Sequence, residues 1–238
     1  MNHDTILTGF QRDGFVIVPE LFTPSECETL KKEARALLDQ PSQTGVTRKP
    51  TVYVGAALAS PLFHALASDQ RLLPYLWQLI PEGPMFLSDK VVYKSASQRF
   101  ASPWHIDQAY WQGTRPKISI WIALDDVAAD NGALIVVPGS HQRIWEHVHG
   151  TGASSNGEFL STTNRTWTSA DEHICALRRG GVIIFSDRLL HASTENISGK
   201  DRYSLISTYQ AAGADEPFDV NFPDRHVLPI LPVEQTVN

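Results

Sequence analysis

The sequence predicts a mainly β protein of the α+β class, whose helices lie in the N-terminal third. Up to about residue 83, helix start signals and apolar residues at helical spacing predominate. From about 84 to 210, apolar and polar residues alternate or form short apolar runs, as strands do. We therefore expect a single domain over residues 1–238: a helical part at 1–83, a β core at 84–210 and an irregular tail that contains several prolines.

Two helices and one strand are expected before residue 40. The first helix should end near Gly14, because a run of β-branched residues follows it. Thr23 is a suitable N-cap for the second helix, Pro24 suits its first position, and Glu26 completes a capping box. This second helix should extend to about Asp39 and act as a scaffold.

The segment between this helix and the β core combines a loop and more helix. Residues 40–60 are rich in Pro, Thr, Gly and Ser, and we expect them to form a loop near the mouth of a functional site. Residues 61–79 should be helical but interrupted around Pro74, because proline has no backbone N–H to donate inside a helix. The N-terminal helices should pack against one face of the sheet.

The β core shows strand patterns separated by turn signals. Within residues 117–126, isoleucines alternate with polar residues, and Trp121 shares a face with Ser119. A large aromatic side chain among polar neighbours suggests that Trp121 lines a cavity. The tripeptide that ends at Gly132, Asp-Asn-Gly, is a strong hairpin signal. The other strands are expected at residues 85–94, 133–137, 173–178, 181–186 and 203–209. The long, weakly patterned segment 142–172 is typical of a lid or a mobile insertion.

A candidate metal site begins with His105 and Asp107. On an extended strand, side chains two positions apart point to the same face, so these two could bind one cation. His191 is a third candidate, because it follows the apolar run 182–185, which should be a buried strand. Two histidines and one carboxylate form the facial ligand set of non-haem Fe(II) oxygenases. Arg202, further along the chain, could form a bidentate pair with a dicarboxylate.

These residues, in this order, resemble the phytanoyl-CoA dioxygenase (PhyH-like) family of Fe(II)/2-oxoglutarate-dependent oxygenases. The resemblance includes the segment that starts at Trp121 and the segment 131–141, and it extends from about Phe10 to about Tyr209. It implies a double-stranded β-helix, the jelly-roll or cupin-like fold of two facing antiparallel sheets. The N-terminal helices would buttress one of these sheets.

The resemblance also implies cofactors and residue roles. The cofactor would be Fe(II), and the co-substrates would be 2-oxoglutarate and O2. The residues that it assigns to iron binding and catalysis are His105, Asp107 and His191. The residues that it assigns to 2-oxoglutarate are Arg202, Ser193, Trp121, Lys90 and Tyr53. The far carboxylate of 2-oxoglutarate would pair with the arginine and accept a hydrogen bond from the serine.

Some of these assignments have alternatives. Lys94 competes with Lys90, since both lysines lie on the same expected strand. Tyr53 stands where the family has a lysine that assists 2-oxoglutarate. Trp104, Tyr110 and Trp111 lie beside the first two metal ligands. They either line an aromatic pocket for a medium-sized, partly apolar substrate or pack the mouth of the barrel.

The implied reaction is the oxidation, in the simplest case the hydroxylation, of a C–H bond of a small metabolite, such as one of specialised metabolism, with release of succinate and CO2. The carboxylate of Asp107 favours this reaction over that of the related halogenases, which have a small residue in its place. Two alternatives remain: a cupin-like metalloenzyme that does not use 2-oxoglutarate, and a jelly-roll binding module without catalysis. The module is disfavoured, because burying two histidines and an aspartate without metal costs several kcal/mol.

The composition of the chain argues against several classes of binding partner. The net charge is −6, and the chain contains neither a basic block nor an apolar run of membrane-spanning length, which argues against nucleic acid or a membrane as partner. A CoA thioester is also disfavoured, and we identify no charged anchor for a free amino acid. Cys27 and Cys175 are too few for a disulfide framework, and the N-terminus has no signal-peptide pattern, so we expect a reducing cytoplasm. No pattern indicates an oligomeric state.

Overall fold

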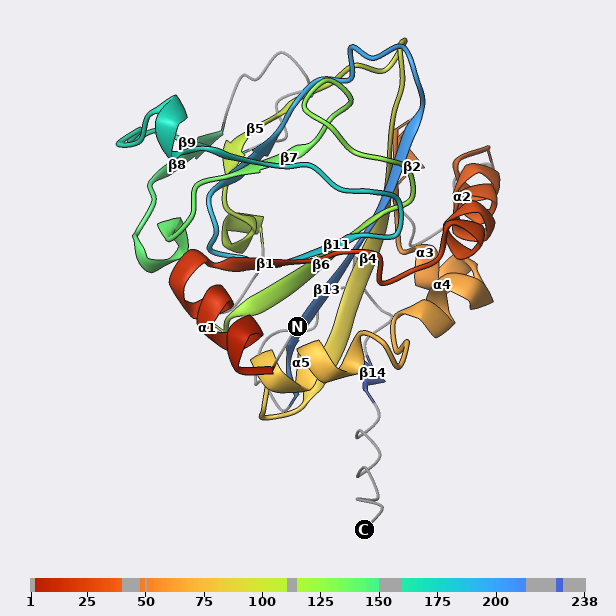
Figure 1. The fold of residues 1–238 in the computed structure, drawn as a ribbon, viewed down its shortest axis with the longest axis horizontal. Coiled ribbons are helices and arrows are strands. Elements are labelled where there is room, and N and C mark those ends of the chain that lie inside the picture. The colour runs from red at the N-terminus through yellow and green to blue at the C-terminus, as the bar shows by residue number, and fades with distance from the viewer. Residues whose placement is uncertain are drawn as a thin grey trace.

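The computed structural model describes residues 3–39, 48–49, 51–110, 115–149, 160–212 and 226–228 (Figure 1). The helices are α1 (His3–Asp13), α2 (Pro24–Asp39), α3 (Ala56–Ala59), α4 (Pro61–Leu66) and α5 (Leu73–Leu79), and the 3-10 helices are η1 (Asp107–Tyr110), η2 (Ser140–Gln142) and η3 (Ser169–Asp171). The strands are β1 (Phe15–Val18), β2 (Arg48–Lys49), β3 (Val52–Val54), β4 (Pro84–Lys94), β5 (Ser102–His105), β6 (Lys117–Ala123), β7 (Leu134–Val136), β8 (His147–His149), β9 (Leu160–Thr162), β10 (His173–Cys175), β11 (Val182–Ser186), β12 (His191–Ser193), β13 (Arg202–Ala211) and β14 (His226–Val227).

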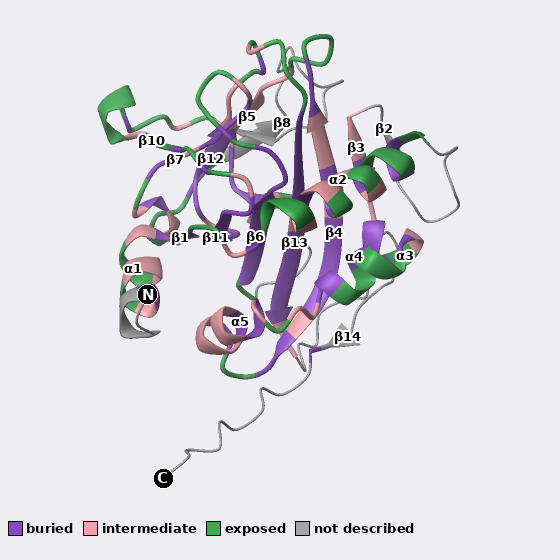
Figure 2. Cartoon of the chain, turned by 45° about the vertical axis from the view of Figure 1, so that its right-hand side comes forward, coloured by how far each residue is buried: buried purple, intermediate pink, exposed green. Residues whose placement is uncertain are grey.

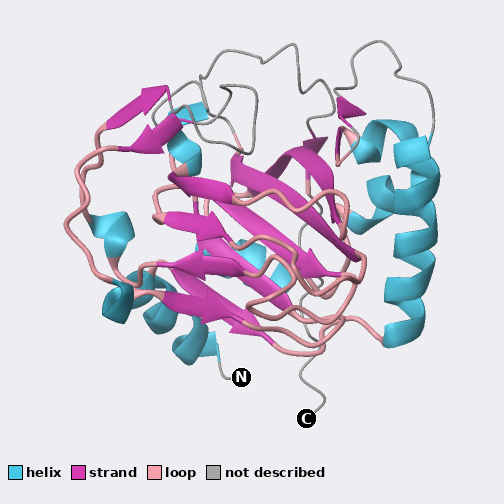
Figure 3. Cartoon of the chain, turned by 90° about the horizontal axis from the view of Figure 1, so that it is seen from above, coloured by secondary structure: helices cyan, strands magenta, loops and turns pink. Residues whose placement is uncertain are grey.

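Two antiparallel sheets face each other in the β core (Figure 3). The larger sheet has the strand order β1-β11-β6-β13-β4-β3-β2, with β14 also paired to β4, and the smaller sheet has the order β10-β7-β12-β5. Apolar side chains from both sheets form one core cluster, in which Trp121 and Ile183 of the larger sheet join Leu134 and Val136 of the smaller one. This arrangement confirms the expected mainly β fold with a jelly-roll core.

The helices cover the outer face of the larger sheet (Figure 2). Ile118, Ile120 and Ile122 alternate along β6, and they belong to the same core cluster as Leu30 and Leu37 of α2. Complete burial of such a side chain contributes about 1.5–3 kcal/mol. The predicted buttress is thus confirmed for α2, and its capping box is present, since the Thr23 amide donates to the Glu26 carboxylate at 2.8 Å.

The opposite, inner face of the larger sheet carries the polar residues. Side chains alternate between the faces of a strand, so the neighbours of the outer core residues on β4, β6 and β13 point inward. Strand register places them in four rows. The rows are Lys94 with Arg202, Val92 with Ser204 and Ala123, Lys90 with Ile206 and Trp121, and Ser88 with Thr208 and Ser119.

The connection between α2 and the β core differs from its prediction. Within residues 40–60, expected as a loop, the described part contains β3 and α3. The carboxylate of Asp89 accepts hydrogen bonds from the Ala57 amide at 3.0 and 3.1 Å, which begins this short helix. The helical stretch 61–79 is interrupted at 67–72 rather than around Pro74. Pro74 lies in the first turn of α5, where its missing N–H is not needed.

Two further expectations lie partly outside the described residues. Of segment 142–172, the described part contains the pair β8 and β9, and residues 150–159 are outside. Of the C-terminal tail, β14 pairs with β4, whereas 213–225 and 229–238 are outside. In the part of the chain that the structure describes, no helix has the length and apolarity needed to cross a lipid bilayer.

Candidate metal centre

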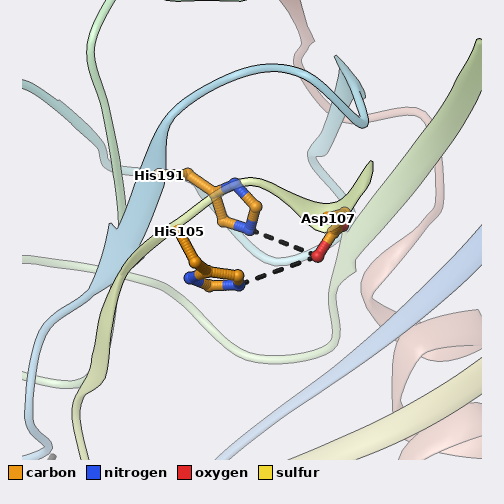
Figure 4. A group of neighbouring side chains, drawn as sticks. All are labelled: His105, Asp107 and His191. Carbon is orange, nitrogen blue, oxygen red and sulfur yellow. Dashed lines mark ion pairs between the residues drawn. The ribbon is translucent and has the colours of Figure 1, made fainter. Parts of the chain in front are cut away.

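His105, Asp107 and His191 converge between the two sheets, as Figure 4 shows. His105 ends β5 and His191 begins β12, and these two residues are directly paired, with ring centroids 4.2 Å apart. One oxygen of Asp107, Oδ1, lies 3.7 Å from the Nε2 atom of each histidine. Among the described residues, this is the group of three with the composition and spacing to hold a metal ion.

Asp107 does not reach this position in the way that the sequence suggested. The strand ends at His105, and Asp107 begins the 3-10 helix η1 instead of continuing the same strand. The Gln108 amide donates to the carbonyl oxygen of Asp187 at 2.9 Å, which ties η1 to the end of β11. The carboxylate therefore faces the histidines because the chain turns, not because strand side chains alternate.

Backbone carbonyl groups fix the orientation of both imidazoles. The Nδ1 atom of His105 lies 2.7 Å from the carbonyl oxygen of Pro103, and that of His191 lies 2.9 Å from the carbonyl oxygen of Leu189. A carbonyl oxygen only accepts hydrogen bonds, so each Nδ1 carries the proton. When the ring is neutral, its Nε2 presents a lone pair towards Asp107, which is the state in which histidine binds metal.

Burial and mutual proximity set the protonation of His105 and Asp107. The three side chains belong to residues that are only 5–8% exposed. Burial, followed by the neighbouring His191, lowers the pKa of His105, which keeps its imidazole neutral. Burial alone would raise the pKa of Asp107, but His191, Lys90 and His105 together hold it below its ordinary value, so its carboxylate is ionised.

This donor set fits a divalent metal ion. Metal–ligand bonds of about 2 Å allow two ligand atoms on one ion to lie up to about 4 Å apart, and the separations between Asp107 and the two histidines are within this limit. Two neutral imidazoles and one carboxylate are the ligands of a facial triad, which leaves other positions of the ion open. The expected convergence of His105, Asp107 and His191 is thus present.

A second polar group lies on the inner face, and we call Lys94, Ser193 and Arg202 the cation cluster. The ammonium of Lys94 donates to the Ser193 hydroxyl at 2.8 Å and to the carbonyl of Thr194 at 2.7 Å. Strand register pairs Lys94 directly with Arg202. Both basic residues are buried, with exposures of 1% and 2%.

Arg202 is held in place by oxygen atoms that carry no formal charge. Its guanidinium donates to the Ser204 hydroxyl at 2.6 Å, to the Gly132 carbonyl at 3.2 Å and to the Asn131 carbonyl at 3.3 Å. The Trp121 ring centroid lies 5.6 Å from the guanidinium carbon. Within the described ranges, no carboxylate forms an ion pair with Arg202 or Lys94.

The cation cluster is therefore short of negative charge. Burial, followed by the charge of Arg202, lowers the pKa of Lys94 to about 6. Burial lowers the pKa of Arg202 to about 10, so the guanidinium stays charged at neutral pH. A buried cation is stabilised when an anion pairs with it. The arrangement thus suits a ligand that brings a carboxylate.

The other two residues expected to bind 2-oxoglutarate, Lys90 and Tyr53, lie apart from the cation cluster. Lys90 lies on the inner face two rows from Lys94, so it is not part of the cation cluster. Tyr53 packs in the outer core among the helices, at 1% exposure, because it pairs with Val91 and shares the outward face of that residue. The structure therefore does not bring Tyr53 to the metal centre or to the cation cluster, in contrast to the expected role in 2-oxoglutarate binding.

Of the three aromatic residues expected to line a substrate pocket, the structure describes Trp104 and Tyr110. Trp104 alternates with His105 along β5 and packs against Trp167, with ring centroids 5.2 Å apart, in a cluster that includes Trp145. It thus anchors the segment after β9 rather than lining the metal centre. The aromatic rings that contact the metal-binding histidines are those of Tyr110, with its centroid 5.9 Å from that of His105, and Phe185, 5.1 Å from that of His191. Trp111 lies outside the described residues.

The sequence analysis assigned no role to Ser119, Ser204 or Gly132. The Ser119 hydroxyl donates to Asp107 Oδ2 at 3.4 Å, and Ser204 is the shortest contact of Arg202. Both serines alternate with outward isoleucine or leucine residues, a signal that could have placed them on the inner face. Gly132 leaves room for the cation cluster, since a Cβ atom there would lie 2.5 Å from Lys94 Cδ and 2.9 Å from Arg202 Nη2.

The chain matches the model of a known protein family. The model of the family described as Phytanoyl-CoA dioxygenase (PhyH) matches residues 10–204, which is most of the chain. The ectoine dioxygenase of Sphingopyxis alaskensis is 26% identical over 242 residues, covering 90% of this chain and 78% of that protein. The L-proline trans-4-hydroxylase of Streptomyces griseoviridis is 26% identical over 251 residues, covering 94% of each.

Solved structures share the fold. The epimerase SnoN in complex with Fe3+, alpha ketoglutarate and nogalamycin RO has a TM-score of 0.73 at 20% identity, covering 95% of this chain and 86% of SnoN. EctD from S. alaskensis with 2-oxoglutarate and 5-hydroxyectoine has a TM-score of 0.72 at 21% identity, covering 94% of this chain and 84% of EctD. At these identities the likeness establishes the fold, which is the expected jelly roll.

Proposed function

Because the chain belongs to the phytanoyl-CoA dioxygenase family, and is thus an Fe(II)/2-oxoglutarate-dependent dioxygenase, we propose that it hydroxylates a C–H bond of a small metabolite. The observation that carries the proposal is the convergence of His105, Asp107 and His191 beside a buried cation cluster that is short of negative charge. With Fe(II) bound, O2 would be the oxidant and 2-oxoglutarate would supply two electrons, so that succinate and CO2 leave with the hydroxylated product.

The metal centre of this chain would hold Fe(II) through three atoms: Nε2 of His105, Nε2 of His191 and Oδ1 of Asp107. The carbonyl groups behind the imidazoles keep both rings in the metal-binding tautomer. Low exposure excludes water from the reacting atoms. The carboxylate of Asp107 takes the place that is a small residue in the related halogenases, which favours hydroxylation or another oxidation without a halide.

The cation cluster would hold 2-oxoglutarate. Arg202 would pair with the far carboxylate, and Ser193 and Lys94 would donate further hydrogen bonds to it, while Trp121 packs beside the chain of the co-substrate. This assignment replaces Lys90 with Lys94, because strand register pairs Lys94 and not Lys90 with Arg202. It also leaves Tyr53 without a role in 2-oxoglutarate binding.

From the relatives we infer only that the substrate is small. Two of them are named for ectoine and for L-proline, both of which are small metabolites. The proposed compartment is the cytoplasm, since Cys27 and Cys175 are free and buried, as is usual for proteins of reducing compartments.

The function can be tested with purified protein, Fe(II), 2-oxoglutarate and O2. Small metabolites, starting with ectoine and L-proline, are added one at a time while succinate release is measured. A substrate should stimulate succinate release and yield a product that is one oxygen atom heavier by mass spectrometry. If iron-loaded, folded protein never consumed 2-oxoglutarate, with or without any of these compounds, the proposal would be wrong.

Gly132→Ala should weaken 2-oxoglutarate binding without affecting iron binding. The new methyl group would collide with Lys94 and Arg202, and displacement of binding groups by about 1 Å can cost about 10²-fold. The measurement is a 2-oxoglutarate titration of the iron-loaded variant. Gly199→Ala is the matched control, because Gly199 also has positive φ (76°) but a Cβ atom there would meet nothing within 4 Å. Equal 2-oxoglutarate affinity in both variants would contradict the location of the site.

Lys94→Met should stabilise the protein free of ligand and weaken 2-oxoglutarate binding. The native pKa of about 6 is below the ordinary 10.5, so between these values the unfolded chain binds a proton that the native protein releases. The Lys94 contribution to stability therefore rises with pH across this window. The variant should lose this slope and gain about 1–4 kcal/mol, which thermal unfolding at pH 7 and pH 9 would measure. A variant less stable than wild type at pH 7 would contradict the prediction.

A further inference from the structure

Lys90 is a cation on the inner face that neither the metal centre nor the cation cluster uses. Lys90 is half-buried. Among the described residues, no acceptor lies within hydrogen-bonding or ion-pair distance of its ammonium group. A partly desolvated charge without a partner costs free energy that a bound anion would offset. Lys90 is thus a candidate anchor for a negatively charged ligand.

The strand register places Lys90 near the metal centre. Lys90 is one row from Thr208, whose hydroxyl lies 3.4 Å from that of Ser119, which in turn contacts Asp107. Side chains on one face of a strand are about 7 Å apart, and neighbouring strands are about 5 Å apart. The four-carbon stem of a lysine covers such distances. In agreement, the charge of Lys90 contributes to lowering the pKa of His105 and of Asp107.

The same register separates Lys90 from the cation cluster. Lys90 pairs with Ile206, whereas Lys94 pairs with Arg202. Four residues along a strand correspond to about 13 Å. Lys94 and Arg202 are directly paired, so they could share one carboxylate of 2-oxoglutarate. The positions of Lys90 and Lys94 are too far apart along the strand to do so. The two lysine positions thus contact different carboxylate groups.

Charge balance indicates which anion remains. The two charges of Fe(II) and the charge of Arg202 are matched by Asp107 and the two carboxylates of 2-oxoglutarate. With a pKa of about 6, Lys94 is mostly neutral at neutral pH. Lys117, also on the inner face, has the carboxyl group of Asp187 beside it. Among the described residues of this face, Lys90 is then the positive charge left over, and the organic substrate is the component of the reaction that has yet to bind.

We propose that Lys90 binds a carboxylate of the organic substrate, and that the substrate is therefore a small carboxylic acid. This inference rests on the proposed function, since it presupposes that the cation cluster holds 2-oxoglutarate. It also supplies the charged anchor that the sequence alone did not identify. Lysine is a compact charge on a flexible stem, so Lys90 would select for the charge of the substrate more strongly than for its shape.

The test begins with the ferrous 2-oxoglutarate complex, formed without O2 and followed by its visible charge-transfer band. The probes are L-proline, L-pipecolate and short aliphatic carboxylates, each compared with its own primary amide. A hydrogen bond to a charged group contributes about 1.5–3 kcal/mol, so at least one acid should perturb the band and stimulate succinate release about tenfold more strongly than its amide.

Lys90→Met should reduce the response to the acids about tenfold or more and leave the 2-oxoglutarate titration unchanged. Lys90→Arg should restore most of the response, because it restores the charge. Lys200→Met, which removes an exposed lysine, is the control for the change in net charge. A Lys90→Met variant that weakened 2-oxoglutarate binding as strongly as Lys94→Met would overturn the inference.

Two other outcomes would also overturn it. One is that amides act as well as acids on the wild-type complex. The other is that the band forms normally but no carboxylate of the set perturbs it. Failure of the proposed function would be distinct from both, since then no charge-transfer band would form with Fe(II) and 2-oxoglutarate in the first place.

Discussion

Asp107→Ala is expected to abolish Fe(II) binding and to lower 2-oxoglutarate turnover about 10³-fold or more, since a metal contact contributes several kcal/mol and each 1.4 kcal/mol is tenfold. Asp107 supplies the one oxygen atom that lies 3.7 Å from both imidazoles. Without it, two neutral imidazoles remain, and no negative charge in the triad balances the metal. Iron content after anaerobic loading and succinate release are the two measurements.

The variant should remain folded, because the described contacts of the Asp107 side chain are confined to its two histidines and the Ser119 hydroxyl. Circular dichroism would verify this. Asp39→Ala, at the exposed end of α2, is the control for loss of a carboxylate elsewhere. Stoichiometric iron in folded Asp107→Ala protein would show that the metal is held by other residues.

Arg202→Met is expected to raise the 2-oxoglutarate concentration needed for half-saturation about 10²-fold or more, because truncating one partner of a buried charged pair costs about 2–5 kcal/mol. Methionine fills much of the same apolar volume but cannot donate a hydrogen bond. Iron binding should be unchanged, since none of the hydrogen bonds of Arg202 involves a metal ligand. The measurement is a 2-oxoglutarate titration at fixed iron.

Arg202 also holds the backbone of Asn131 and Gly132, so stability must be measured beside affinity. A thermal unfolding midpoint within a few degrees of wild type would show that the hairpin survives. Arg178→Met is the matched control, because the Arg178 side chain is 81% exposed. If the stable Arg202→Met protein bound 2-oxoglutarate as wild type does, the cation cluster would not be its site.

Alternation of side chains made much of the core predictable. The isoleucines of β6 identified the outward face, and that placed Trp121 inward, where it contacts Arg202. The three metal-binding side chains were identified by residue type and family pattern. The same alternation rule was misleading for Asp107, because it assumed that the strand continued past His105, whereas the backbone turns into η1.

Other features depend on contacts that no local pattern contains. The choice between Lys90 and Lys94 rests on which lysine is opposite Arg202 in the neighbouring strand, and both lysines lie on one face of β4. Trp104 packs against Trp167, a partner from a distant and weakly patterned segment. Tyr53 was expected in a loop but belongs to a strand whose register turns it outward. Pairing over long separations, rather than propensity, decides these positions.

The most direct test of the central claim is an anaerobic titration of the protein with Fe(II) and 2-oxoglutarate, followed by the visible charge-transfer band of the chelate. We predict a saturable band in the wild type, a band that needs much more 2-oxoglutarate in Arg202→Met, and no band in Asp107→Ala. The absence of the band from folded, iron-loaded wild-type protein would contradict the assignment of both the metal centre and the cation cluster.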